Sequence, residues 1–282
     1  MTPFNINQFA ENLTEKEGIF FSKKINELSY PTDGNDFYFN LEDTGFWFNH
    51  RNNCIIPLAK RYVKDHIFFD IGGGNGFVSK GLEKAGIQVW LVEPGMHGCL
   101  NAKKRGLANI ICSDLENAGF KPGSIFSIGL FDVIEHIEND IDFLGQINHY
   151  LQTAGIVILT VPAYRFLWSK EDIDAGHYRR YTLRELKNKL NRSGFEIVYS
   201  GYIFSFLILP VLFFRTIPSL LGLAKSGLEK NKKEHTFNTN HGFLNRLLTK
   251  LLSFETTRIE NLRKIPFGGS CLVVAKKNGK PR

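Results

Sequence analysis

The sequence predicts an α/β fold whose centre is a doubly wound, mostly parallel β-sheet, and two observations lead to this prediction. First, the apolar run Ile67–Phe69 passes Asp70 and enters a dense glycine turn, Gly72–Gly76, from which a helix follows. Second, the apolar runs 89–92 and 110–112 each lead into an acidic residue. Strands that alternate with helices indicate a parallel sheet, in which ligands bind at the carboxyl ends of the strands.

The glycine turn has the composition of a cofactor-binding loop. Gly72, Gly74 and Gly76 lack Cβ atoms, so the main chain can reach positive φ and approach a ligand closely. The helix that begins at about Phe77 adds free N–H groups. In the dinucleotide fingerprint the third glycine comes five residues after the first, and that position is Phe77 here. The spacing therefore disfavours NAD and FAD.

Acidic residues stand at the ends of the next strands. The run Val89–Val92 ends at Glu93, which is the position from which an acid accepts hydrogen bonds from ribose hydroxyls in a doubly wound sheet. The third strand leads to Asp114. The fourth strand, Ile125–Phe131, is followed by the segment 132–136 at the same edge of the sheet.

These ordered motifs resemble those of class I S-adenosylmethionine-dependent methyltransferases over roughly residues 65–200. The resemblance implies a Rossmann-like, doubly wound sheet of seven strands, mostly parallel with an antiparallel last strand. It also implies S-adenosylmethionine as the cofactor and a bacterial branch that acts on small molecules or lipids. The residues that carry the resemblance are Asp70-Ile71-Gly72-x-Gly74-x-Gly76, Glu93, Asp114 and Asp132-Val133-Ile134-Glu135-His136.

The same resemblance assigns roles in cofactor binding. The methyl group of a sulfonium is already activated, so the enzyme mainly aligns a nucleophile in line with it, and alignment contributes about 7–11 kcal/mol. No metal is required by this chemistry. The implied contacts are Gly72, Gly74 and Gly76 along the methionine and ribose portion, Asp70 bracing or touching it, Glu93 on the ribose, Asp114 beside the adenine, and Asp132 in the same set.

The rest of the chain divides into parts of one domain of 282 residues. Residues 1–60 are rich in aromatic residues and form either a helical cap on the sheet or a substrate lid in which Arg51 faces an anion. Residues 61–203 and 270–278 form the cofactor-binding core, and residues 204–269 form a helical insertion before the last strand. Within the core we expect a helix over 75–85 and three further strands, at Gly155–Val161, Phe195–Gly201 and Cys271–Lys276.

The segment 162–182 is longer than a crossover loop needs and concentrates aromatic, acidic and arginine side chains at the carboxyl edge. We interpret it as the substrate loop. Its arginine pair would clamp a phosphate or carboxylate, and the alternative is a set of salt bridges within the loop. Thr182 and Glu185 form a capping box that starts the next helix. The predicted substrate-binding residues are Trp168, Asp172, Arg179, Arg180 and Tyr181.

Two histidines are candidate catalytic residues. His136 is the first candidate for a general base because imidazole titrates near neutral pH. The alternative is a loop histidine that holds the motif through hydrogen bonds. His177 is the second candidate, and we expect it to form an acid/base pair with Asp172. If the acceptor is a carboxylate or an acidic carbon, both histidines only position it.

The start of the insertion, Tyr202–Leu223, is apolar apart from Arg215 and a few hydroxyls, and it approaches the roughly 20 residues that span a bilayer. Pro210 and Pro218 interrupt it, and a central arginine costs about 2.5–3.5 kcal/mol. We therefore expect a re-entrant hairpin, or one that lies on the membrane surface, rather than a spanning helix. The alternative is an apolar lid over the site or an apolar dimer surface. Lysines that would meet anionic headgroups follow at 225, 230, 232 and 233.

Composition limits the cell compartment and the partners. The four cysteines have no C-x-x-C spacing, which argues against a disulfide framework and a zinc site. Residues 1–18 lack the apolar core of a secretory signal. We expect a cytoplasmic protein with peripheral contact at the inner membrane face. The net charge of +7 is spread along the chain and selects no partner.

The predicted function is methyl transfer from S-adenosylmethionine to a small or lipid-linked acceptor with an anionic group, by direct in-line displacement. The alternative is a non-catalytic cofactor-binding or scaffold protein of the same fold. Nucleic-acid methylation is disfavoured because no Asn/Asp-Pro-Pro-Tyr/Phe motif follows the fourth strand and no basic stripe carries interleaved aromatics. We expect no nucleic-acid partner, and the sequence leaves the oligomeric state open.

Overall fold

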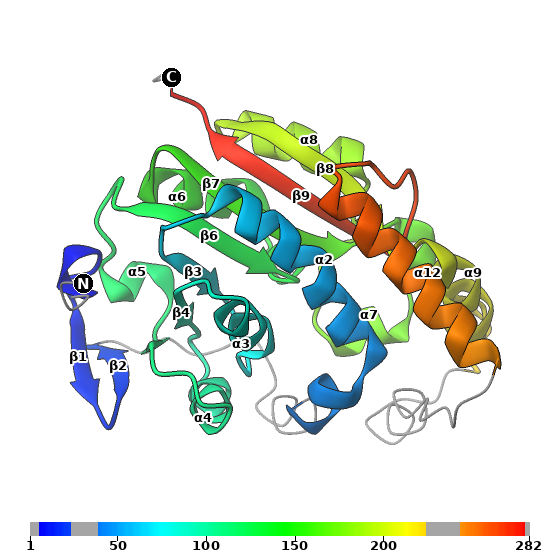
Figure 1. The fold of residues 1–282 in the computed structure, drawn as a ribbon, viewed down its shortest axis with the longest axis horizontal. Helices are drawn as coiled ribbons and strands as arrows, with labels where there is room; N and C mark the ends of the chain where they lie inside the picture. The colour runs from blue at the N-terminus through cyan, green and yellow to red at the C-terminus, as the bar shows by residue number, and fades with distance from the viewer. Residues whose placement is uncertain (1–5, 24–38, 224–242, 280–282) are drawn as a thin grey trace.

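The computed structural model describes residues 6–23, 39–223 and 243–279, which form one mixed β-sheet with helices on both faces (Figure 1). The strand order is β1-β2-β5-β4-β3-β6-β7-β9-β8. The strands are β1 (Leu13–Lys16), β2 (Ile19–Ser22), β3 (Phe68–Ile71), β4 (Val89–Val92), β5 (Ile110–Cys112), β6 (Ile125–Phe131), β7 (Leu151–Pro162), β8 (Phe195–Ile203) and β9 (Ser270–Lys277).

The centre of the sheet confirms the predicted fold class. Strands β5, β4, β3, β6 and β7 are mutually parallel. Strand β9 runs antiparallel to both of its neighbours, β7 and β8. Because the central strands are parallel, the loops that follow β3, β4, β6 and β7 all leave the sheet at one edge.

The prediction of seven strands is wrong, because the described chain adds a hairpin at the β5 edge. Strands β1 and β2 pair antiparallel around Glu17 and Gly18, whose φ values of 53° and 74° fit a type I′ turn. Strand β2 then pairs parallel with β5. The first part of the predicted helical cap is therefore sheet, and it covers backbone groups that an edge strand would leave unpaired.

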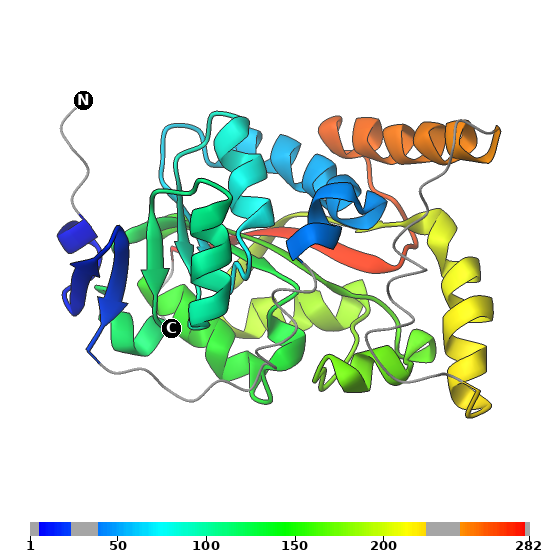
Figure 2. The ribbon, with the colours of Figure 1, turned by 90° about the horizontal axis from the view of Figure 1, so that it is seen from below.

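The helices form two layers, shown edge-on in Figure 2. One layer packs on buried side chains such as Phe68 and Leu91, and the other packs on Phe69 and Trp90, because successive strand residues face opposite sides. The first layer contains α2 (Phe46–Tyr62), α3 (Phe77–Lys84), α4 (Met96–Lys104) and α12 (Phe243–Glu260), and the second contains α5 (Leu115–Ala118), α6 (Asp140–Tyr150) and α8 (Leu183–Arg192).

Local signals in the sequence set several helix ends. Thr182 and Glu185 form the predicted capping box at the start of α8. Asn139 caps α6 by accepting a hydrogen bond from the Asp142 N–H. Strand β7 begins at Leu151, four residues before the predicted start, because its first residue pairs with Ile125 across a register shift.

The described part of the insertion is helical from Ser205 to Leu220. It consists of η4 (Ser205–Leu207), α9 (Ile208–Val211), the π-helical turn η5 (Leu212–Thr216) and α10 (Ile217–Leu220). The expectation that Pro210 and Pro218 interrupt this segment is wrong. A proline ring displaces the carbonyl four residues earlier, and the wider π turn before Pro218 accommodates that displacement.

Within the described ranges, no helix combines the length and the apolar character that crossing a membrane requires. The lysines predicted to meet headgroups lie in 224–242, outside the described residues. Helix α12 then returns the chain to the sheet and packs on α2, with Ile259 in the same core as Leu58.

Asp70, at the end of β3, makes the stability of the fold depend on pH. Asp70 is 1% exposed, and this burial raises its pKa to about 6. A hydrogen bond of 2.7 Å from the Ser79 hydroxyl lowers the pKa but does not cancel the effect of burial. In the unfolded chain Asp70 ionises near its ordinary value of 3.8. The folded state therefore holds the extra proton between these two values, and stability falls as the pH rises through that window.

We expect Asp70→Asn to remove this loss, because an amide does not ionise. The free energy of unfolding of the wild type should fall by about 3 kcal/mol more than that of the variant between pH 4 and pH 7. Urea unfolding at several pH values measures the difference. Asp65→Asn, at an exposed acid five residues earlier, is the matched control and should follow the wild type. Parallel curves for the wild type and Asp70→Asn would contradict the prediction.

Candidate active site

The glycine turn leaves β3 at the carboxyl edge with the predicted backbone. Gly72, Gly74 and Gly76 have φ values of 69°, 53° and 75°. A Cβ at Gly76 would lie 2.6 Å from Cδ1 of Leu107, so the turn is tightly packed on that side. At Gly74 no atom lies within 4 Å of the Cβ position, so this residue borders open space. At Gly74 the turn therefore presents bare backbone to open space.

Glu93 links the glycine turn to the loop after β4. Its Oε2 accepts a hydrogen bond of 3.0 Å from the Gly74 N–H, and its Oε1 accepts one of 2.7 Å from the Gly95 N–H. Burial raises the pKa of Glu93 to about 7 although both hydrogen bonds favour the charged form. The carboxylate thus lies directly beside the open space at Gly74.

The other predicted cofactor acids have different surroundings. Asp114 caps α5, and its two oxygens accept hydrogen bonds of 2.7 Å from the backbone and side-chain amides of Asn117. Asp70 lies behind the glycine turn, and its Oδ1 has no hydrogen-bond partner among the described residues. Asp70 therefore supports the glycine turn from the buried interior and does not border the open space at Gly74.

Asp132 begins the segment after β6 in a strained backbone conformation. Its φ is 57°, a left-handed value that usually costs a non-glycine residue about 1–3 kcal/mol. Its Oδ1 accepts a hydrogen bond of 3.0 Å from the Thr160 hydroxyl, and its Oδ2 accepts one from Arg51 on α2. Arg51 therefore meets an anion within the protein itself.

The two candidate catalytic histidines lie against each other. His136 belongs to η2 (Ile134–His136), and His177 lies in the loop after α7 (Lys170–Asp174). Their ring centroids are 4.7 Å apart with an interplanar angle of 79°. Burial, with a smaller contribution from His177, lowers the pKa of His136 to about 4, although Asp132 raises it. Burial also raises the pKa of Glu135 well above its usual range.

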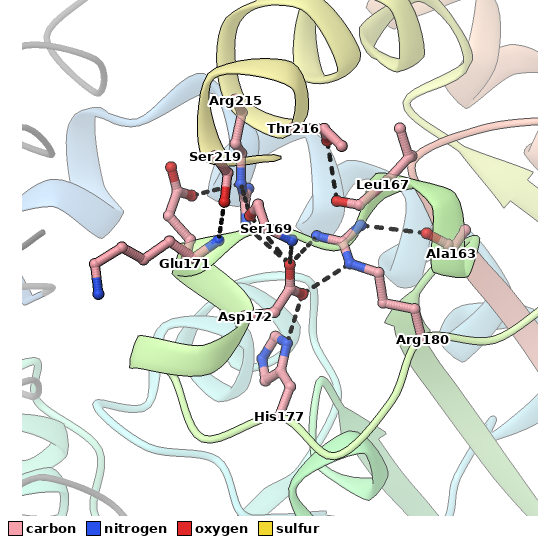
Figure 3. A network of polar contacts seen from close by, with 11 residues as sticks. Ala163, Leu167, Ser169, Glu171, Asp172, His177, Arg180, Arg215, Thr216 and Ser219 are labelled. Carbon is pink, nitrogen blue, oxygen red and sulfur yellow. Dashed lines mark hydrogen bonds and ion pairs between the residues drawn. The ribbon is translucent and has the colours of Figure 1, made fainter. Parts of the chain in front are cut away.

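Asp172 is the centre of the predicted substrate loop (Figure 3). It is fully buried and accepts hydrogen bonds from the Ser169 N–H (2.9 Å) and hydroxyl (3.1 Å). Arg180 donates two more, from Nε (2.7 Å) and Nη2 (3.0 Å), and the Nδ1 atom of His177 lies 2.9 Å away. These hydrogen bonds hold the pKa of Asp172 well below its usual range although burial alone would raise it.

The predicted substrate residues therefore fall into two groups. Asp172, Arg180 and Tyr181 are bound by other protein groups, and the Tyr181 hydroxyl donates a hydrogen bond of 2.8 Å to Asp140. Trp168 is half-buried, and Arg179 keeps 27% of its side chain exposed while it pairs with Asp140 at 3.0 Å. Only the second group reaches the surface of the loop.

The insertion packs directly on this loop. Arg215 donates a hydrogen bond of 3.0 Å to the Ser169 hydroxyl and pairs with Glu171 at 2.7 Å. The Ser219 hydroxyl accepts a hydrogen bond of 2.8 Å from the Lys170 N–H (Figure 3). An insertion distant in sequence thus helps to fix the loop that carries Asp172.

The sequence shows no sign of a second buried ion pair, Arg105 with Glu42, which lies against the glycine turn. Arg105, the residue directly after α4, donates hydrogen bonds of 2.6 Å to Glu42 and 2.9 Å to the Asn75 carbonyl. Burial raises the pKa of Glu42 to about 7, although Arg105 lowers it. The pair holds the helical segment 39–44 against the turn. No local motif marks these residues, because they are more than 60 positions apart.

A sequence profile described as a methyltransferase domain matches residues 55–200, which is about half of the chain. The chain belongs to this methyltransferase family. The matched range contains every predicted cofactor-binding, catalytic and substrate-binding residue of this methyltransferase. A comparison of the chain with curated protein sequences found no match. Its assignment to a bacterial branch acting on small molecules or lipids stays a prediction.

Solved structures share the fold of this methyltransferase. Phosphoethanolamine N-methyltransferase 2 of Haemonchus contortus, crystallised with S-adenosyl-L-methionine, has a TM-score of 0.55 and 16% identity. The alignment covers 92% of this chain and 62% of that enzyme, so the chain spans less than two thirds of its length. A methyltransferase from Archaeoglobus fulgidus has a TM-score of 0.50 and 17% identity, with 82% and 99% of the two chains covered.

The 4+2 cyclase SpnF also shares the fold, with a TM-score of 0.51, 16% identity and 82% of each chain covered. At these identities the likeness concerns the fold alone, because one fold can carry different reactions.

We expect Asp172→Ala to destabilise this methyltransferase by about 3–5 kcal/mol, because it leaves the buried Arg180 guanidinium without its carboxylate. Urea unfolding measures the loss. The control is Asp174→Ala, which removes an exposed acid paired with Lys170 on the same short helix and should cost no more than about 1 kcal/mol. Equal effects of the two substitutions would show that Asp172 does not hold the loop together.

Proposed function

We propose that this protein transfers the methyl group of S-adenosylmethionine to a small or lipid-linked acceptor that carries an anionic group. The observation that carries the proposal is the open space at Gly74, whose N–H donates a hydrogen bond to the Glu93 carboxylate. Membership of the methyltransferase family supports it.

The residues at the carboxyl edge fit this cofactor. Gly74 leaves space at the turn, and Glu93 offers carboxylate oxygens to ribose hydroxyls beside that space. Asp114 follows the third parallel strand of the core and borders the adenine in this arrangement. Asp70 fixes the turn from behind through Ser79. When bound, S-adenosylmethionine supplies an activated methyl group on a positively charged sulfur.

The chain's own residues then hold the acceptor. His136 and His177 lie after β6 and β7, at the edge where β3 delivers the glycine turn. In this proposal they orient the nucleophilic atom for direct in-line displacement, and such alignment contributes about 7–11 kcal/mol. Trp168 packs on the acceptor, and Arg179 meets its anionic group. Asp172, Arg180 and Tyr181 shape the loop that presents these side chains.

Two observations support an anionic and amphiphilic acceptor. A structure of the Haemonchus contortus enzyme contains phosphomonomethylethanolamine and S-adenosylhomocysteine, so a protein of this fold binds a small phosphorylated amine. The insertion beside the substrate loop exposes a set of large apolar side chains, which is unusual for a solvated surface. The exposed fractions are Leu209 62%, Phe213 57%, Phe214 74%, Leu220 76%, Leu221 66% and Leu223 71%. In this proposal the set rests on the cytoplasmic face of a membrane.

We expect calorimetric titration to show that the wild type binds S-adenosylmethionine and S-adenosylhomocysteine. Glu93→Gln should weaken binding by about ten- to a hundredfold, because one charged hydrogen bond contributes about 1.5–3 kcal/mol. Glu196→Gln, at an exposed acid on β8, is the matched control and should bind like the wild type.

Absence of binding by the wild type would refute the methyltransferase proposal and leave a scaffold protein of this fold. Equal binding by the wild type and Glu93→Gln would remove Glu93 from the cofactor site and leave the activity in place.

We expect the double substitution Phe213→Ser with Phe214→Ser to lower the affinity of the protein for anionic lipid vesicles at least tenfold, measured by co-sedimentation. Burial of each phenylalanine in the lipid interface contributes about 1.5–3 kcal/mol at most. The matched control is Met96→Ser with Leu100→Ser, which removes two side chains exposed by 41% and 43% on α4. Identical sedimentation of the wild type and both double variants would show that the insertion does not contact lipid.

A further inference from the structure

Glu135 is a fully buried acid whose carboxylate oxygens have no hydrogen-bond partner in another described residue. Two arginines act on it electrostatically, but Arg51 pairs with Asp132 and Arg180 with Asp172. Ionising a carboxyl group in such a buried place costs several kcal/mol, which is why burial raises the pKa of Glu135 well above its usual range. The position therefore favours a ligand that supplies positive charge directly to these oxygens.

His177 is oriented in the way that proteins orient metal-binding histidines. Its Nδ1 lies 2.9 Å from Oδ1 of the fully buried Asp172, and because an ionised carboxylate can only accept, Nδ1 carries the proton. The Nε2 atom is then the nitrogen that can coordinate. A carboxylate behind a coordinating imidazole fixes the ring and makes it a stronger ligand.

His136 completes the cluster from the other side. Backbone hydrogen bonds with Ala175 and Gly176 act on the ring, which ties η2 to the loop that carries His177. One ligand atom from each of Glu135, His136 and His177 lies within 4.8 Å of the other two. Around a tetrahedral zinc ion with bonds of about 2.0–2.1 Å, ligand atoms lie about 3.3 Å apart. Side-chain rotations that move each atom by about 1 Å close the difference.

We propose that Glu135, His136 and His177 form a binding site for one divalent metal ion of the zinc or iron(II) class. Two imidazoles and one carboxylate suit these ions better than magnesium or calcium, which prefer oxygen ligands. Three protein ligands also leave a coordination position open, as in catalytic rather than structural sites. The cysteine spacing and the cofactor chemistry predicted no metal, and the meeting of these two loops is a feature of the tertiary structure alone.

The site has a use in methyl transfer, and this part rests on the proposed function. An acceptor hydroxyl bound at the open position would release its proton to water at a lower pH than in solution. The resulting oxygen anion would form a bond to the methyl carbon while the carbon–sulfur bond breaks. The bonding electrons go to sulfur, so the positively charged sulfonium becomes a neutral thioether and the charges balance. The acceptor class is therefore a hydroxyl compound.

The test is equilibrium dialysis of chelator-treated full-length protein against Zn²⁺, with bound metal measured by elemental analysis. We expect one ion per chain, and we expect Glu135→Gln and His177→Ala each to weaken binding by at least tenfold. His149→Ala removes an exposed histidine on α6 and is the control for surface binding. No bound ion, or binding that survives both site substitutions, would overturn the proposal.

A second measurement protects the test against variants that fail to fold. The visible spectrum of the wild type titrated with Co²⁺ should show the intense bands of a four- or five-coordinate ion, and its absence would also overturn the proposal. Calorimetry of S-adenosylmethionine with metal-free protein separates the two proposals. Cofactor binding without metal binding defeats the metal site alone, and metal binding without cofactor binding defeats methyl transfer alone.

Discussion

Asp172 accepts hydrogen bonds from Ser169, His177 and Arg180 in a fully buried position, and the loops at the candidate site depend on this carboxylate. Burying a charge costs several kcal/mol unless hydrogen bonds replace the lost water. At Asp172 the replacement comes from both ends of the substrate loop, and Arg215 of the insertion lies 3.9 Å away. The same carboxylate orients His177 toward Glu135 and His136. One buried acid therefore couples the insertion, the substrate loop and the histidine pair.

The parallel sheet supplies the second constraint. Strands β3, β4, β6 and β7 end at one edge, so the glycine turn, Glu93, Asp132 and the substrate loop meet there although up to 110 positions separate them. The turns at this edge are tight, and three non-glycine residues after the strand ends, Asp132, Tyr164 and Phe204, have φ values of 57°, 57° and 62°. Such strain persists where packing over-determines the backbone, which is a common property of functional sites.

Prediction from sequence succeeded where the signal is local. The glycine turn, the strand Ile125–Phe131 and the Thr182–Glu185 capping box each depend on residues within a few positions, and the structure has all of them. It failed at the N-terminus, where Ile19–Ser22 reads as an aromatic-rich stretch and becomes a strand only because the edge of β5 is available. It also misjudged Pro210 and Pro218, because the helix adapts to proline through a π turn that no short pattern announces.

The sequence by itself determined the fold class and the place of the glycine turn, because the spacing of residues along one strand and one turn decides them. Only the tertiary structure decided which charged residues face each other. Arg180 and Asp172, eight positions apart, satisfy each other, whereas Arg51 pairs with Asp132 and Arg105 with Glu42 across more than 60 positions of the sequence. It also decided that Glu135 has no hydrogen-bonding partner in another described residue while two histidines converge on it. Partners of buried charges are set by packing between elements, and packing is not encoded at any single stretch of the chain.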